Sequence, residues 1–391
     1  MTTISSIYLT PQIRLIIITI SSILLILSSS SNSVYAKPNH SHTFMTIYAF
    51  GNSYTDTGNT WSKTGPSGFT FVSNPPYGST FFHHPTNRYS DGRLVIDFVA
   101  QALSLPFLAP YLDRKANKSS GINFAVAGST AIAHSFFVKH NMRINITPQS
   151  LRTELAWFDK YLLEGEGCKD SSTTPRECGA VFRKALVWVG EMASNDYAYS
   201  YGSFVPTKTI QKLAINSFVD FLQALLRKGA KYVVVQGLPP IGCLTLSLYV
   251  ARPDDRDNTR CVASANKQSE VHNTALKTQL NLLRKQYPKF IIIYADYYNA
   301  YLNVIKNARK YKFKELFKAC CGYGGGAYNY DYLNVCGSPS SRSCVGPSRF
   351  VNWDGAHLTE AMYKAISDGI VNGSFSQPPF RSFWIDKHQS G

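Results

Sequence analysis

Two short motifs near opposite ends of the chain hold side chains that could carry out one reaction together. Ser53 follows an apolar run at residues 46–50, and Asp354 stands three residues before His357. Acyl transfer by serine needs a hydroxyl nucleophile, a base that takes its proton, and an acid that orients the imidazole of that base. We therefore interpret Ser53, His357 and Asp354 as the candidate nucleophile, general base and orienting acid.

Each of these residues also has an ordinary structural explanation. A serine after a strand is usually a turn residue, and an Asp-x-x-His segment is usually the start of a helix. Two further segments argue against chance. Residues 121–129 are rich in small side chains and end close to Gly128, whose N–H a ligand could approach closely. Residues 189–197 carry Asn195, whose amide donates hydrogen bonds without titrating. The four segments in this order favour a functional site.

The elements that must position these residues are visible as continuous apolar runs. Continuous rather than alternating runs are what a parallel sheet buried on both faces requires. The predicted strands are residues 46–50, 185–189, 232–235 and 290–294. Helices are predicted between and after them, from Thr147-Pro148 with a stripe that ends at Leu162, from about Thr207 to Lys228, from after Asn258 to Tyr287, and from about Thr359 to Val371.

Strands that alternate with helices predict a three-layer α/β/α domain with right-handed crossovers. Active sites of such domains lie beyond the carboxyl ends of the strands. Ser53 directly follows the first predicted strand, and Asn195 comes shortly after the second. The architecture and the motifs therefore predict the same location for the chemistry.

Taken together, the segments 49–59, 121–129, 189–197 and 352–360 resemble the four blocks of the plant GDSL esterases/lipases. These proteins belong to the SGNH hydrolase superfamily, named for its Ser, Gly, Asn and His blocks. The flanks at residues 87–93 and Cys320-Cys321-Gly322 extend the resemblance over essentially the whole mature chain. It implies a three-layer α/β/α sandwich with a mainly parallel, flavodoxin-like central sheet.

The resemblance also implies a role for each matching residue. Ser53 is the expected nucleophile, His357 the general base, and Asp354 the acid that orients His357. The expected oxyanion hole consists of the backbone N–H groups of Ser53 and Gly128 and the side chain of Asn195. Losing one such donor typically costs about 3–4 kcal/mol of transition-state stabilisation. No metal and no organic cofactor are expected.

The chain departs from the family pattern at two places that bear on activity. Asn52 replaces the aspartate of the Gly-Asp-Ser-Leu motif, which removes a charge beside the nucleophile, and Tyr54 replaces its leucine. Ala193 and Ser194 stand where relatives usually have glycines, so the loop of Asn195 is expected to be less pliant.

The first residues predict a secretory leader. Arg14 precedes an apolar run, and Val34-Tyr35-Ala36 supplies small residues for cleavage. We expect residues 1–36 to be a signal peptide and residues 37–391 a single hydrolase domain, secreted to the apoplast or cell wall and not spanning the membrane. A membrane anchor is the competing interpretation, but the run is short and interrupted by Ser21-Ser22.

Eight cysteines, all after the leader, predict up to four disulfides in an oxidising compartment. Cys168 with Cys178 and Cys243 with Cys261 are the expected pairs, and the pairing of the others stays open. No Cys-x-x-Cys or histidine cluster accompanies them, so a zinc site is not expected. Sequons predict N-glycosylation at Asn39, Asn117, Asn145 and Asn372.

The formal charge is +16, and Arg14 is the only charged residue of the leader. Lysines and arginines are scattered in runs no longer than pairs, so a nucleic-acid groove is not indicated. Weak contact with an acidic cell-wall polysaccharide is the interpretation that fits an extracellular basic protein, and plain solubility is the alternative.

The leading hypothesis is a secreted serine esterase or lipase that hydrolyses a small-molecule ester or an acyl lipid through a Ser53 acyl-enzyme. An acyltransferase of specialised metabolites would use the same intermediate, with an alcohol in place of water. A secreted binding protein on the same scaffold is the third hypothesis, supported only by Asn52.

Overall fold

The computed structural model describes residues 44–60, 71–142, 147–165 and 175–383. The described residues all belong to one compact unit. The predicted leader (1–36), the sequons at Asn39 and Asn145, and Cys168 lie outside what the structure describes, so the predicted pair Cys168–Cys178 stays a prediction.

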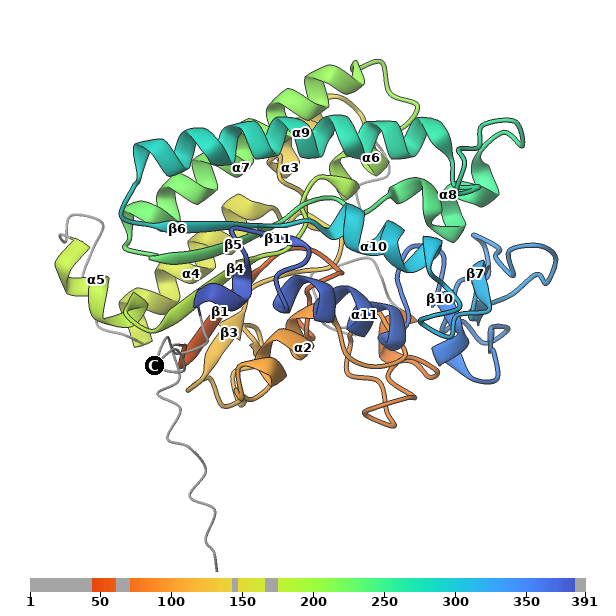
Figure 1. The fold of residues 1–391 in the computed structure, drawn as a ribbon, viewed down its shortest axis with the longest axis horizontal. Coiled ribbons are helices and arrows are strands. Elements are labelled where there is room, and N and C mark those ends of the chain that lie inside the picture. Colours follow the sequence, from red (N-terminus) through yellow and green to blue (C-terminus); the bar gives the residue numbers. More distant parts are fainter. Residues whose placement is uncertain (1–43, 61–70, 143–146, 166–174, 384–391) are drawn as a thin grey trace, which may run out of the picture. The chain divides into compact units, whose positions relative to one another are not determined.

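A seven-stranded sheet forms the middle layer, in the order β11-β6-β5-β4-β1-β3-β2 (Figure 1). Its neighbours are all parallel except β11, which runs antiparallel to β6. The strands are β1 (Thr46–Phe50), β2 (Ala109–Pro110), β3 (Gly121–Asn123), β4 (Ala185–Val189), β5 (Tyr232–Gln236), β6 (Ile291–Ala295) and β11 (Ser376–Gln377). In chain order the strands β1, β3, β4, β5 and β6 lie in the flavodoxin-like order 2-1-3-4-5. The predicted fold class is confirmed.

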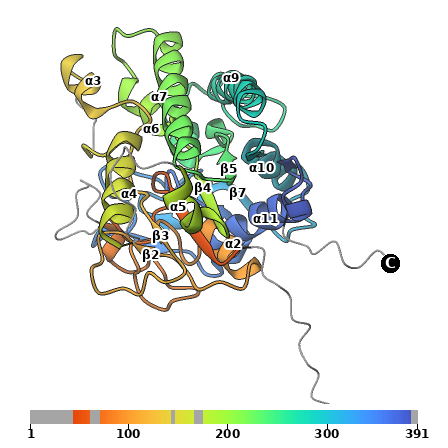
Figure 2. The same ribbon diagram turned by 90° about the vertical axis from the view of Figure 1, so that its left-hand side faces the viewer.

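Successive side chains of the central strands enter two separate apolar layers. In β1, Phe50 packs into one cluster with residues of α4, α7 and α9, whereas Ile47 packs into a second cluster with residues of α2, α10 and α11. In β4, Val187 and Trp188 divide in the same way. The two views show these helix groups on opposite faces of the sheet (Figures 1 and 2). Burial on both faces explains why the strands are continuously apolar.

The helices connect and cover the strands. They are α2 (Val95–Ala102), α3 (His134–Lys139), α4 (Leu151–Gly165), α5 (Pro175–Phe182), α6 (Ser194–Ser200), α7 (Thr207–Arg227), α8 (Thr245–Val250), α9 (Ala263–Gln286), α10 (Tyr297–Lys306) and α11 (Glu360–Val371), with 3-10 turns η1 (Phe71–Ser73), η2 (Ile241–Cys243), η3 (Pro347–Arg349) and η4 (Phe380–Phe383). Within the described part of the chain, no helix combines the length and apolarity needed to cross a bilayer.

The bounds of the predicted strands and helices agree with the structure to within one residue, except at two helix starts. The helix predicted from Thr147-Pro148 begins at Leu151, because Ser150 forms a bridge with Thr130 in extended conformation. The helix predicted after Asn258 begins at Ala263. There the carboxylate of Asp257 accepts hydrogen bonds from the N–H groups of Thr259 and Cys261, and these bonds hold the intervening residues in a turn.

Three disulfides join described cysteines. Cys243–Cys261 confirms the sequence prediction. The adjacent cysteines pair separately, Cys320 with Cys344 and Cys321 with Cys336. These two bonds hold a lobe that contains β8 (Cys321–Gly322) and β9 (Arg342–Ser343), beside the parallel pair β7 (Glu315–Ala319) and β10 (Phe350–Asn352).

Candidate active site

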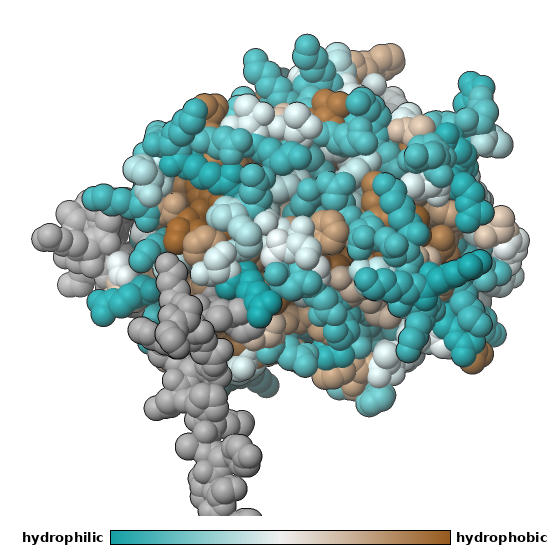
Figure 3. Space-filling model, viewed as in Figure 1, coloured by the Kyte–Doolittle hydropathy of each residue, from teal (hydrophilic) through white to brown (hydrophobic). Residues whose placement is uncertain are grey.

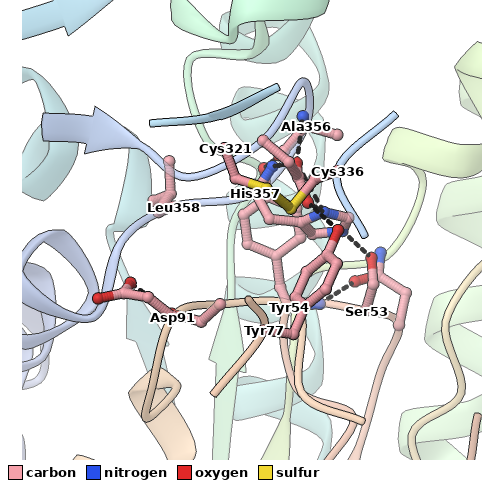
Figure 4. Close-up of polar contacts among 12 residues, drawn as sticks. Ser53, Tyr54, Tyr77, Asp91, Cys321, Cys336, Ala356, His357 and Leu358 are labelled. Atoms are coloured by element: carbon pink, nitrogen blue, oxygen red, sulfur yellow. Dashed lines mark hydrogen bonds and ion pairs between the residues drawn. A yellow bond between two sulfur atoms is a disulfide. The ribbon is translucent and has the colours of Figure 1, made fainter. Parts of the chain in front are cut away.

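The structure brings the two ends of the domain together at one hydrogen bond. His357 Nε2 lies 2.8 Å from Ser53 Oγ, and its Nδ1 lies 2.9 Å from Asp354 Oδ2. Figure 4 shows the side chain of His357 above Ser53, with a dashed line for the hydrogen bond between them. Ser53 and His357 retain only 6% and 5% of their exposure. A hydroxyl, an imidazole and a carboxylate in this series can move a proton from the serine to the histidine.

Asp354 is held as a carboxylate by its neighbours. Its Oδ2 accepts the hydroxyl proton of Tyr77 at 2.8 Å, and its Oδ1 accepts the N–H groups of Ala356 and His357 at 2.7 Å each. Burial alone would raise the pKa of Asp354, but the charge interaction with His357 and these hydrogen bonds hold the pKa below its usual value. Asp354 therefore stays ionised and can favour the His357 tautomer that carries its proton on Nδ1.

The position of Ser53 follows from the order of the strands. Ser53 comes three residues after β1, and β4, which ends at Val189, is the parallel neighbour of β1. In the 2-1-3-4-5 order the crevice between these two strands is the topological switch point, where open α/β sheets bind ligands. The two turns approach closely: a Cβ added to Gly190 would lie 2.2 Å from Thr55 Oγ1. Only glycine fits at that position.

Asn195 contacts the segment that contains Gly128 through the carbonyl group of Ser129. One amide N–H of Asn195 donates to Ser129 O at 2.9 Å, while Tyr199 donates to Gly128 O at 2.8 Å. Gly128 has a φ of 81°, in the left-handed region that glycine adopts without strain. The structure thus brings Asn195 to the segment of Gly128.

Three buried carboxyl groups connect the loops of Ser53, Gly128 and Asn195. Each carboxyl group connects two of these loops. Glu154 accepts from Gly51 N at 2.9 Å and from Ser129 Oγ at 2.7 Å, so it joins the loop of Ser53 to the loop of Gly128. Burial raises the pKa of Glu154 well above its usual value. Its own hydrogen bonds oppose that rise without overcoming it.

Glu191 and Asp196 join the remaining pairs of loops. Glu191 Oε1 accepts from Asn52 Nδ2 at 2.7 Å and from Ser194 Oγ at 2.6 Å. Asp196 accepts from the backbone N–H groups of Ala131 and Ile132 at 2.9 and 2.8 Å. Burial raises the pKa of Glu191 and raises that of Asp196 to about 7. We call Glu154, Glu191 and Asp196 the acid ring, because each member connects two of the three loops.

The Asn52 side chain, which departs from the family motif, is a member of this network. Besides donating to Glu191, it accepts the N–H of Tyr54 at 3.1 Å through Oδ1. Asn52 is fully buried. An amide suits the position because it can donate to Glu191 and accept from Tyr54 at once. The neighbouring departure, Ala193, adopts a φ of 108°, which is strained for a residue with a side chain.

Residues 87–93 contact both His357 and the start of the helix that follows it. The ring of Tyr89 lies 4.5 Å from the imidazole of His357, centroid to centroid. Asp91 accepts the N–H of Glu360 at 2.7 Å, and Arg93 forms an ion pair with the Glu360 carboxylate at 2.8 Å. These contacts fix the start of α11 directly after the loop of His357.

The disulfide lobe binds the strand that leads into the same loop. Cys320 N donates to Asn352 O at 3.0 Å, and Cys321 N donates to Trp353 O at 2.6 Å. Trp353 N in turn donates to His357 O at 2.8 Å. The loop of Asp354 and His357 is thus closed on itself and attached to the disulfide-bonded lobe.

Four residues of this network, Tyr77, Glu154, Glu191 and Asp196, were not predicted from the sequence. Glu191 and Asp196 lie within a recognised block and could have been singled out as acids beside Asn195. Glu154 and Tyr77 carried no signal, since one is an ordinary first-turn residue of a helix and the other lies in a loop far away in sequence.

Known proteins of one family resemble this chain over most of its length. The profile of the family described as GDSL-like Lipase/Acylhydrolase matches residues 47–370. A GDSL esterase/lipase of Arabidopsis thaliana is 49% identical over 94% of this chain and 96% of its own length. A second from the same plant is 41% identical over 86% of each chain. Acetylajmalan esterase 2 of Rauvolfia serpentina is 36% identical over 84% of this chain and 90% of its own.

Proposed function

Because the chain belongs to the GDSL-like lipase/acylhydrolase family and is a carboxylic ester hydrolase, we propose that it cleaves its substrate through an acyl-enzyme on Ser53. His357 is the general base and Asp354 its orienting acid. The single observation that carries this proposal is the 2.8 Å contact between His357 Nε2 and Ser53 Oγ, with His357 Nδ1 on the Asp354 carboxylate.

In the first half-reaction the Ser53 oxygen attacks the ester carbonyl carbon while its proton moves to His357 Nε2. The carbonyl oxygen becomes an oxyanion, which we propose is stabilised by the N–H groups of Ser53 and Gly128 and the free N–H of the Asn195 amide. The imidazolium then protonates the leaving alkoxide as the carbon–oxygen bond breaks. Alcohol departs, and the acyl group stays on Ser53.

In the second half-reaction a water molecule attacks the acyl carbon and gives its proton to His357. The same three donors stabilise the second oxyanion. Collapse expels the Ser53 oxygen, which recovers the proton from His357, and the carboxylic acid is released. The series regenerates the starting protonation states, so hydrolysis needs no further reactant.

We expect Ser53→Ala and His357→Ala each to lower kcat for a short-chain aryl ester by about a thousandfold or more. The matched control is Ser79→Ala, a serine exposed on the surface. Unfolding curves verify that the variants fold. A fluorophosphonate probe should label Ser53 in the parent protein. Retained turnover in either variant, or failure of the probe to label, would contradict the assignment.

Hydrolysis is favoured over acyl transfer by the similarity to acetylajmalan esterase 2, a protein named for ester cleavage.

We further propose that residues 1–36 are a secretory leader, that residues 37–391 form one hydrolase domain, and that the protein acts outside the cell. The disulfides support export, because such bonds persist in oxidising compartments. The substrate class is a small-molecule ester or an acyl lipid.

A further inference from the structure

A groove outside the candidate active site is lined mainly by positive charges. It encloses about 500 Å³ between α8 with its following loop and strand β7. Its cations are Arg256, Arg260, Lys314 and Lys318, and its one acidic residue is Glu315. Within the described part of the chain, none of the four cations takes part in an ion pair. Glu315 and the neighbouring Asp255, which interacts electrostatically with Arg256, offset part of this charge, and the lining keeps a net positive charge.

Two of these cations are held in place by the fold. The guanidinium of Arg256 donates to the backbone carbonyls of Leu248, Arg252 and Asp255 at 2.8–3.2 Å. The guanidinium carbon of Arg260 lies 5.3 Å from the ring centroid of Phe317. Fixed cations lose little conformational entropy when an anion binds.

The sequence next to the groove adds more positive charge of the same kind. Residues 306–318 contain six lysines and arginines and one acid, Glu315. The segment runs from the end of α10 through β7. Lys306, Arg309, Lys310 and Lys312 are exposed. Hydrophilic residues cover much of the face shown in Figure 3, with hydrophobic residues scattered among them. The basic surface is therefore longer than the groove, as a polymer with repeated negative charges requires.

The groove also holds two aromatic side chains, Phe317 and Tyr328. Their rings offer an apolar surface against which the C–H face of a sugar ring can pack, while the neighbouring cations bind carboxylates. We propose that this groove binds an acidic polysaccharide built from uronic acid units. The ligand is recognised by its regularly spaced carboxylates together with its sugar rings.

The groove neighbours the loop of the candidate catalytic histidine. Helix α8, which contributes Leu248 to the groove, also donates from Leu246 N to Gly355 O at 2.8 Å. The ring of Tyr249 packs on Tyr330 with centroids 5.3 Å apart, and Tyr330 lies against Gly355. A polysaccharide in the groove would thus lie beside the active site without occupying it.

Binding of polygalacturonate oligomers, measured by calorimetry at about 50 mM salt, tests this proposal. The test variant is Lys314→Glu/Lys318→Glu, which we expect to bind about tenfold or more weakly. The matched control is Lys208→Glu/Lys212→Glu on α7, two exposed lysines with the same change of net charge. The control should change affinity by less than about twofold. Because the proposal does not depend on catalysis, Ser53→Ala should bind like the parent.

Three other ligands test which chemical features of polygalacturonate the groove recognises. Fully methyl-esterified polygalacturonate lacks the charges, polyglutamate lacks the sugar rings, and an RNA oligonucleotide carries phosphates. Each should bind at least about fivefold more weakly than polygalacturonate. Equal binding of the methyl ester, of polyglutamate or of RNA would overturn the assignment to a uronate polymer. Equal loss of affinity in the control variant would overturn the assignment to this groove.

Discussion

At the scale of single residues, the candidate base His357 is oriented by Asp354, and Asp354 is in turn oriented by Tyr77 and two backbone N–H groups. Asp354 receives the hydroxyl of Tyr77 and two backbone N–H groups in addition to the imidazole. Because the carboxylate cannot rotate without breaking these bonds, the imidazole ring has one favoured position. We therefore expect Tyr77 to act on catalysis through Asp354 and not by touching substrate.

Tyr77→Phe removes one donor to the Asp354 carboxylate and changes nothing else in its shape. We expect kcat for an aryl ester to fall about tenfold. Loss of a hydrogen bond to the charged form raises the pKa of Asp354, so the acid limb of the rate profile should move to higher pH. A pH series of kcat/KM measures this. An unchanged acid limb with a normal rate would show that Tyr77 has only a packing role.

Asn52 shows why an amide replaces an acid beside the nucleophile in this chain. Its amide N–H lies 2.7 Å from the Glu191 carboxylate, and both side chains are fully buried. A carboxylate at position 52 would place two acids in contact in a site where burial already raises the pKa of Glu191. The amide removes that repulsion and provides a donor.

Asn52→Asp should therefore destabilise the protein, and more so at high pH. The two acids would share a proton in the folded state, so their folded pKa rises above the unfolded value and stability is lost as pH rises. We expect a loss on the order of 2 kcal/mol at pH 8 and a smaller loss at pH 5. Urea unfolding at both pH values measures it. The double variant Asn52→Asp/Glu191→Gln restores one amide and one acid and should recover most of the stability, which no explanation based on position 52 alone predicts.

At the scale of elements, the site is built from loops that the chain brings together from four distant places. The strands fix where each loop begins, since β1 and β4 end side by side. The acid ring then connects three of these loops to each other, and the disulfide lobe holds the fourth through Asn352 and Trp353. The strands therefore determine the approximate positions of the loops, and the buried polar contacts determine their final positions.

Removing the disulfide next to the catalytic loop should affect both stability and rate. Cys321→Ser/Cys336→Ser opens a loop with a sequence separation of 15, which corresponds to about 3 kcal/mol. Thermal unfolding measures this loss. Because Cys321 N supports Trp353 O, kcat of the folded variant should also fall. Cys243→Ser/Cys261→Ser, with a separation of 18, is the control and should lose similar stability with a smaller change in kcat. Equal effects on kcat would contradict a local role of the lobe.

At the scale of the whole molecule, the disulfides and two of the sequons fit the export that we propose. Six of the described cysteines form three disulfides, and the described sequon residues Asn117 and Asn372 are exposed. Each accepts a backbone N–H two residues later in its own turn, so neither amide is buried in the core. A glycan could be attached at either position without changing the fold.

Expression through a plant secretory pathway should therefore yield a protein that begins at Lys37 and carries glycans on Asn117 and Asn372. N-terminal sequencing determines the first point. For the second, Asn117→Gln and Asn372→Gln should each lower the mass by one glycan, and peptide N-glycosidase should remove the difference from the parent. A full-length N-terminus, or no mass change in either variant, would contradict export along this route.

Much of this architecture could be predicted from the sequence because it depends on local patterns. Continuous apolar runs identify buried parallel strands, and Ser53 and His357 lie in blocks with recognisable neighbours. Glu154 and Tyr77 could not be predicted, because their partners are 103 and 277 residues away and nothing in their own surroundings distinguishes them. The helix starts at Leu151 and Ala263 differ from prediction because tertiary bonds hold the preceding residues out of the helix.

The acid ring has a consequence for how this enzyme can be altered. Each of its members connects two separate stretches of chain, so exchanging one stretch for that of a distant relative leaves a buried carboxyl group without the donors it needs. Chimeras made block by block should fail where chimeras that move all three stretches together succeed. We therefore expect that the three loops can be exchanged between relatives only as one set.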